Sequence, residues 1–235
     1  MNHISSMPIH IFSRAISGMF ACFAVAWSIT SLACPLSMTY QEVDRGVEKI
    51  ANFSIVRDQT GYSVAILSTQ GKEQTREELL CDSTWNTLRW HYRSDNNTDI
   101  VFKRCGDSIV LTGILRGKPV SKILGIDEHP WYQLITLGMR AVSADSAKDV
   151  KFWAVSIDGP VVLKAVPFRV VAITDTSLPG HPEIWCRCAQ VKLDGVFGRL
   201  WNGYYYIRSD NGRFVHYEGY RLGSKKPAGT IDVVQ

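Results

Sequence analysis

Hydrophobic and polar residues alternate along most of the chain, and short turn-like breaks separate the alternating stretches. In the clearest stretch, Leu88, Trp90 and Tyr92 fall on one face of a strand with polar residues between them. The pair Asn211-Gly212 is a strong hairpin signal between two such stretches. About eleven strands are expected at this regular spacing. The predicted strands cover residues 62–68, 87–93, 99–104, 108–115, 118–126, 150–157, 161–174, 183–193, 204–209, 213–219 and 229–234.

One segment follows a helical period instead. Trp131, Leu134 and Ile135 recur at positions i, i+3 and i+4, and a proline precedes them. The sequence therefore predicts one short helix over about residues 130–142, with Asp127 in the role of its N-terminal cap.

Many strands beside a single helix predict a mainly all-β fold. We expect a large curved antiparallel sheet or half-open barrel with one short covering helix. The helix would cover part of the concave apolar face, which would otherwise be open to water. No stretch between the predicted strands has the composition of a domain linker, so residues 34–235 are expected to form a single β domain.

Composition narrows the class of protein without naming a reaction. Hydrophobic residues make up 46% of the 235 residues and charged residues 20%, which excludes wholesale disorder. The mean hydropathy of -0.04 excludes a protein with many membrane spans. The net charge of +4 is small and dispersed, so no nucleic-acid partner is expected.

The first 33 residues are typical of a secretory signal peptide. Arg14 precedes an uncharged apolar run, and the run ends in the small residues Ser31 and Ala33 at the two positions that a signal peptidase reads. The predicted location is outside the cytoplasm, in the periplasm or cell envelope. Cleavage after Ala33 would expose Cys34, so lipidation of this cysteine is an open alternative, and a retained anchor is another. Membrane contact is expected only if Cys34 is lipidated.

Export gives the cysteines an oxidising environment. Cys81, Cys105, Cys186 and Cys188 are therefore disulfide candidates. Cys186 and Cys188 lie two apart in a predicted strand and point to one face, so they cannot easily bond to each other. A Cys81–Cys105 bridge is the simplest pairing, although three pairings are possible and buried free thiols remain an alternative. The spacing is not that of a structural zinc site, and no metal is expected.

Few residues are arranged as a catalytic site would require. His216 and Glu218 share a face of one strand, as a general base and its orienting carboxylate would. Asp127, Glu128 and His129 cluster before the predicted helix, where capping explains the acids. An exposed polar face beside a hairpin also explains the His216 pair. We therefore predict no catalytic residue and no cofactor.

The order of segments in the second half resembles a known family. Residues 125–132 lead from strands into the predicted helix, residues 201–218 form a strand, an Asp-Asn-Gly turn and a returning strand, and Gly229 begins the last strand. This order resembles the exported bacterial family catalogued as domain of unknown function 3108, over nearly all of the chain after the signal. The resemblance implies a curved sheet around a helix, similar to the lipoprotein carriers of the Gram-negative periplasm. It brings no catalytic residues with it.

The leading hypothesis is a non-enzymatic envelope protein that binds an apolar or lipid-like molecule inside the half-barrel. The predicted cavity residues are aromatic and aliphatic side chains of the strands and helix, namely Trp90, Trp131, Leu134, Ile135, Trp153 and Trp185. One alternative is an envelope assembly factor that binds another envelope protein through its sheet edge. A third is an exported enzyme with a dispersed site, built on His216 with Glu218 or on the cysteine pair.

Overall fold

The computed structural model describes residues 36–234 except 146–148, 158–161, 196–197 and 225. Within these residues the chain forms fourteen strands and one helix. The elements are β1 (Leu36–Asp44), β2 (Val47–Arg57), β3 (Gly61–Gln70), β4 (Glu73–Asp82), β5 (Thr87–Ser94), β6 (Thr98–Arg104), β7 (Ser108–Leu115), β8 (Lys118–Gly125), α1 (Ile135–Asp145), β9 (Lys151–Ser156), β10 (Lys164–Leu178), β11 (His181–Leu193), β12 (Trp201–Arg208), β13 (Phe214–Arg221) and β14 (Gly229–Val234).

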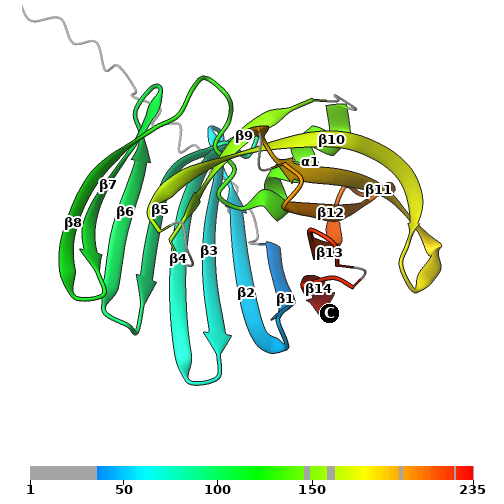
Figure 1. Cartoon of the computed structure of the whole chain (residues 1–235), viewed down its shortest axis with the longest axis horizontal. Helices are drawn as coiled ribbons and strands as arrows, with labels where there is room; N and C mark the ends of the chain where they lie inside the picture. The colour runs from blue at the N-terminus through cyan, green and yellow to red at the C-terminus, as the bar shows by residue number, and fades with distance from the viewer. Residues whose placement is uncertain (1–35, 146–148, 158–161, 196–197, 225, 235) are drawn as a thin grey trace, which may run out of the picture. The chain divides into compact units, whose positions relative to one another are not determined.

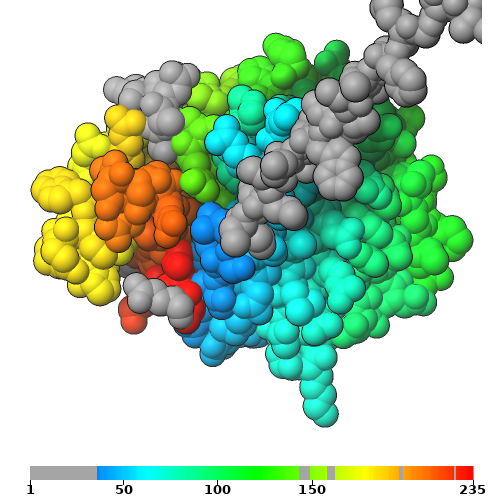
Figure 2. Space-filling view, turned by 180° about the vertical axis from the view of Figure 1, so that it is seen from behind, coloured from blue at the N-terminus to red at the C-terminus, as the bar shows by residue number. Residues whose placement is uncertain are grey.

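All fourteen strands belong to one antiparallel sheet in the order β8-β7-β6-β5-β4-β3-β2-β1-β14-β13-β12-β11-β10-β9. The first and last strands, β1 and β14, pair in the middle of this order and join two meanders. From behind, the blue β1 and the red β14 lie side by side (Figure 2). The sheet curves round without closing, and its two edges are β8 and β9 (Figure 1). The predicted fold class is therefore confirmed.

The two edges of the sheet approach each other at a region that we call the seam. The Lys122 ammonium on β8 donates to the Leu163 carbonyl, 2.9 Å away, just before β10. An isolated bridge joins Trp131 to Trp153 of β9. The seam thus brings the ends of the curved sheet together through the segment between β8 and α1.

The seam gives β9 a backbone partner on its outer edge. The Tyr132 amide donates to the Trp153 carbonyl and the Trp153 amide donates to the Pro130 carbonyl, both at 2.8 Å. The Gln133 side-chain amide continues the pattern, because it accepts from the Val155 amide at 2.9 Å and donates to the Val155 carbonyl at 3.1 Å. This side chain therefore takes the place of a peptide group in the ladder.

Strand alternation places one face of the sheet around the main core. In β6 and β7, Ile100, Phe102, Ile109 and Leu111 are fully buried while the residues between them are more exposed. The rings of Trp90 and Phe102 stack with centroids 4.5 Å apart. Side chains fill this face, so it forms a packed interior.

The helix begins later than the sequence indicates. Backbone groups of Pro130 and Tyr132 pair with β9, a bend follows at Gln133 and Leu134, and α1 starts at Ile135. Asp127 is therefore not the cap of α1. The helix packs against β11, β12 and β13. A side chain at Gly138 would lie 2.5 Å from the Tyr132 ring, so only glycine allows this close approach.

Three strands were not predicted. Strand β4 reads EQTREELLCD, in which three consecutive charged residues precede three consecutive apolar ones, so it has no period-two alternation. Strands β1 and β2 carry mixed, partly buried positions. Pairing with β14 holds β1 in the sheet, and pairing with β3 holds β2 there. A local hydrophobic pattern does not reveal such pairing partners.

The predicted signal peptide and Cys34 lie outside the described residues. Among the residues that are described, no helix is long and apolar enough to cross a membrane.

Candidate functional site

The predicted cavity residues lie mostly inside the packed core. Trp90 and Trp131 are 1% and 0% exposed. Leu134, Ile135 and Trp153 are partly buried against the same core. Trp185 is 64% exposed on β11, so its prediction as an interior cavity residue is wrong. It lies at the end of the β11–β12 ladder, where its carbonyl accepts from the Ser209 amide at 3.0 Å. The β10–β11 hairpin extends beyond the rest of the sheet (Figure 1).

A surface groove of about 700 Å³ lies elsewhere, between the β10–β11 hairpin and the ends of β1, β12, β13 and β14. We call it the hairpin groove. Its lining combines apolar side chains with arginine, histidine and carboxylate groups, a mixture and a volume typical of small-molecule sites. The lining residues are Ser37, Met38, Thr39, Leu178, Pro179, His181, Ile184, Arg208, Asn211, Arg213, Phe214, Val215, His216, Glu218, Asp232, Val233 and Val234.

A second apolar cluster supports one wall of this groove. Cys186, Cys188 and Tyr206 are buried together, and partly buried neighbours including Ile184 and Val215 pack against them. Alternate residues of β11, such as Ala189, belong to the main core instead. Strand β11 is thus apolar on both faces, which explains why its cysteines share a face but do not enter the interior.

All four described cysteines are free thiols. The expected Cys81–Cys105 bridge is not formed, and β5 explains why, because it lies between the strand of Cys81 and the strand that leads to Cys105. Two strand spacings amount to roughly 9–10 Å. A disulfide bridges Cα atoms no more than about 7 Å apart.

The paired cysteines are poor nucleophiles. Burial raises the pKa of the Cys188 thiol to about 11, although the Tyr206 hydroxyl donates to its sulfur. Burial also raises the pKa of Cys186. A thiol reacts as its thiolate, so both groups are chemically quiet near neutral pH.

His216 stands between two carboxylates on the wall of the groove. Its Nδ1 lies 2.6 Å from Asp232 Oδ1, and its Nε2 lies 3.4 Å from Glu218 Oε1. The Tyr220 hydroxyl donates to the other oxygen of Glu218 at 3.0 Å. The His216 side chain is only 13% exposed. The predicted proximity of His216 and Glu218 is therefore confirmed, and β14 adds a second acid.

Two arginines lie at the β12–β13 turn end of the groove. The Arg208 amide donates to the Arg213 carbonyl at 2.8 Å, so the two residues face each other across the hairpin. Arg208 donates from Nε and one Nη to Asp210, at 3.0 and 2.6 Å. Within the described part of the chain, the Arg213 guanidinium has no hydrogen bond or ion pair.

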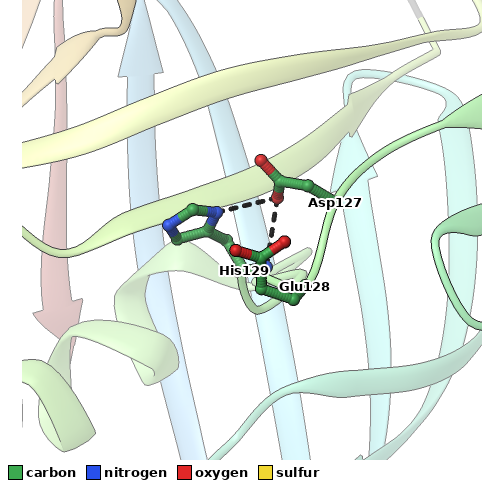
Figure 3. Close-up of side chains that lie close together, drawn as sticks. All are labelled: Asp127, Glu128 and His129. Atoms are coloured by element: carbon green, nitrogen blue, oxygen red, sulfur yellow. Dashed lines mark hydrogen bonds and ion pairs between the residues drawn. The ribbon is translucent and has the colours of Figure 1, made fainter.

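Asp127, Glu128 and His129 lie close together before α1 (Figure 3), and Asp127 forms a hydrogen bond at the seam. Asp127 Oδ1 accepts from the Trp153 indole at 2.7 Å and from the His129 backbone amide at 3.1 Å, and it lies 2.8 Å from His129 Nδ1. The Trp153 hydrogen bond is the main reason that the pKa of Asp127 falls to about 2. Asp127, Glu128 and His129 lie close enough together to hold a metal ion, but existing donors already use the Asp127 oxygen.

Sequence reasoning found His216 and Glu218 but missed Asp232, Arg208 and Arg213. Asp232 lies directly opposite His216 in the β13–β14 ladder, and that register is not visible in a single sequence. The sequence did contain a signal for the two arginines, because both flank the Asn211-Gly212 turn. This turn lies between β12 and β13, as predicted.

Comparisons with known proteins identify the fold and no function. No protein-family model matches the chain, and no curated protein matches it. The chain is similar to the crystal structure of a β-barrel-like protein of domain of unknown function DUF1849 from Brucella abortus, with 9% identity and a TM-score of 0.55. The match covers 87% of this chain and 97% of the other. The fold is thus β-barrel-like and of unknown function, and membership of the 3108 family stays a prediction.

Proposed function

We propose that this chain is an exported protein of the periplasm or cell envelope that binds an apolar or lipid-like molecule without converting it chemically. The hairpin groove carries this proposal. It has apolar lining from Leu178, Ile184 and Val215 and a volume of about 700 Å³. Burial of an acyl chain would contribute about 0.8 kcal/mol per CH₂, which is enough for capture and reversible release.

Because side chains fill the core, the proposed binding site is the hairpin groove and not the interior of the half-barrel. Trp90 and Trp131 are in contact with the protein on all sides, so a ligand would have to displace them. The hairpin groove, by contrast, is already open at the surface. The binding role predicted from the sequence is therefore retained, and its location changes.

The geometry favours binding over catalysis. A histidine that acts as a general base needs one ring nitrogen free to take a proton. In His216, Asp232 lies at Nδ1, and Nε2 has no hydrogen-bond partner but is buried 3.4 Å from Glu218, so neither nitrogen is open to a substrate. The paired thiols are buried and their pKa values are raised.

Native mass spectrometry tests this function directly. The full chain is expressed with export, purified after the processing that the cell carries out, and measured alongside its solvent extract. We expect a reproducible bound mass in the lipid range, or uptake of lipid on incubation. A protein that stays bare after incubation with lipids contradicts the proposal.

A matched pair of variants locates the site. Ser37 is exposed and lines the hairpin groove, so Ser37→Trp fills the groove without disturbing the core. Ser121 is equally exposed on β8, and Ser121→Trp is the control. We expect only Ser37→Trp to reduce uptake. Equal uptake by both variants would place the site elsewhere.

An assembly role through the sheet edge is the second candidate. Among the described strands, none pairs with the outer edge of β8, whereas the seam covers β9. Ile123 of β8 is 69% exposed. However, Pro119 and two lysines lie on the same strand, and such residues discourage strand addition. A partner envelope protein that co-purifies after export, and is lost with Ile123→Lys, would favour this role.

A further inference from the structure

We propose that the ligand of the hairpin groove is a single-chain amphiphile with an anionic oxygen headgroup, a carboxylate or a phosphate, which is held by Arg213 and Arg208. The inference rests on the proposed binding function and names the class of ligand. The acidic side chains of the groove have partners within the protein, whereas the two arginines keep hydrogen-bond donors for a ligand.

Each acidic group that lines the groove already has a partner inside the protein. Asp232 is 2.6 Å from the His216 ring, and Glu218 accepts from Tyr220 at 3.0 Å. The His181 ring, which also lines the groove, lies 3.3 Å from the Glu183 carboxylate. A cationic headgroup would have to compete with these internal partners.

The arginines are the groups with free donors. Arg213 is exposed on the groove and its guanidinium has no partner among the described residues. Arg208 gives Nε and one Nη to Asp210, which leaves its other Nη for a ligand. A guanidinium fork matches the two oxygens of a carboxylate or phosphate, so this end of the groove complements an anion.

The tail of the ligand has an apolar path away from the arginines. Ser37, Met38 and Thr39 line the hairpin groove and also a second hollow of about 460 Å³ on β1 to β4. We call this hollow the outer trough. Its lining includes Ala65 and Leu67, together with the charged residues Arg76 and Glu78. A chain that leaves the arginines can thus cross β1 over Ser37 and Thr39 and continue into the trough.

The headgroup is tested with amphiphiles that share one tail. Binding of hexadecanoate, hexadecyl phosphate, hexadecanol and hexadecyltrimethylammonium to the full exported chain is measured by displacement of a fluorescent apolar probe. The two anions are expected to bind about tenfold more tightly than the alcohol or the cation, since a charge-assisted hydrogen bond has about this effect. Comparison of the two anions distinguishes a carboxylate from a phosphate source.

A matched arginine pair assigns the preference to the groove. Arg213→Gln is expected to lower the affinity for the two anions about tenfold and so remove their preference over hexadecanol. Arg89 is exposed on β5 and lines neither hollow, so Arg89→Gln keeps the preference and controls for net charge. An equal effect of both variants would overturn the assignment to Arg213.

The tail path is tested by filling the trough. Ala65 is exposed, and Ala65→Trp would place a ring in the outer trough without touching the arginines. We expect weaker binding of hexadecanoate and unchanged binding of octanoate. Equal loss for both chain lengths would contradict the path.

The outcomes separate the inference from the function on which it rests. Uptake of all four amphiphiles with equal affinity overturns the anionic headgroup and leaves the binding function intact. Failure to bind any of the four overturns both.

Discussion

The seam and the hairpin groove contain the same pair of residue types in different settings. At the seam, His129 Nδ1 lies 2.8 Å from Asp127, and the same carboxylate oxygen also accepts from Trp153 and from a backbone amide. In the groove, His216 Nδ1 lies 2.6 Å from Asp232, a carboxylate that is 56% exposed. One pair lies within the seam, and the other lines the hairpin groove.

This difference shows that the neighbours of a polar group decide whether it stabilises the fold or is available to bind a ligand. The polar groups of the seam replace missing strand pairing, so their hydrogen bonds stabilise the fold. In the groove, an arginine with no partner among the described residues and a histidine beside two acids line a surface hollow, where charged pairs stabilise a fold only weakly. Substitutions at the seam should therefore change stability, and substitutions in the groove should change binding.

The largest effect is expected for Trp131 at the seam. Trp131→Ala removes a fully buried ring and should reduce the free energy of unfolding by about 3–5 kcal/mol. Trp185→Ala, on the exposed hairpin, should change it by less than about 0.5 kcal/mol. Denaturant unfolding followed by circular dichroism compares them. Equal losses would mean that the hairpin is as integral to the fold as the seam.

The Gln133 side chain should give the next largest effect. Its oxygen accepts from Val155 and from the Trp131 indole at 2.9 and 3.0 Å, and its nitrogen donates to the Val155 carbonyl. Gln133→Leu leaves these groups without partners and should cost about 1–3 kcal/mol of unfolding free energy. Gln133→Glu keeps the acceptor and should cost less. A Leu variant as stable as the parent would show that the edge of β9 does not need this cover.

Acid should weaken the seam through Asp127. Its pKa is about 2 in the folded chain, below the usual 3.8, because Trp153 and His129 donate to the carboxylate. A lowered folded pKa contributes stability that is fully present above the unfolded value and is lost as the pH falls towards about 2. The carboxylate is nearly half exposed, so we expect an effect on the order of 1 kcal/mol.

Asp127→Asn isolates this contribution. The variant keeps an oxygen acceptor but has no charge, so it should be less stable than the parent at neutral pH. The gap in unfolding midpoint should close as the pH approaches the folded pKa. A gap that stays constant with pH would show that the carboxylate charge does not support the seam.

The sequence predicts the sheet better than the seam, for a physical reason. Period-two alternation and the Asn211-Gly212 turn are local, and the structure contains β12 and β13 where they were expected. The seam depends on distant partners, because the Trp131 amide donates to Asn86, which lies 45 positions earlier. The same dependence explains the late start of α1 and the unexpected pairing of His216 with Asp232.

Substitution of the two histidines, His216 in the groove and His129 at the seam, should give the smallest changes in stability and a clear contrast in ligand binding. His216→Gln should alter the unfolding free energy by less than about 1 kcal/mol, because the Asp232 partner is largely solvated. It should nevertheless lower the affinity for a groove ligand by a few fold, since His216 lines the groove.

His129→Gln removes the ion pair with Asp127 and should leave ligand affinity unchanged, since His129 is not part of the groove. Isothermal titration and denaturant unfolding on both variants test this contrast. If both variants lose affinity equally, the groove and the seam are not separate in function, and the comparison between them fails.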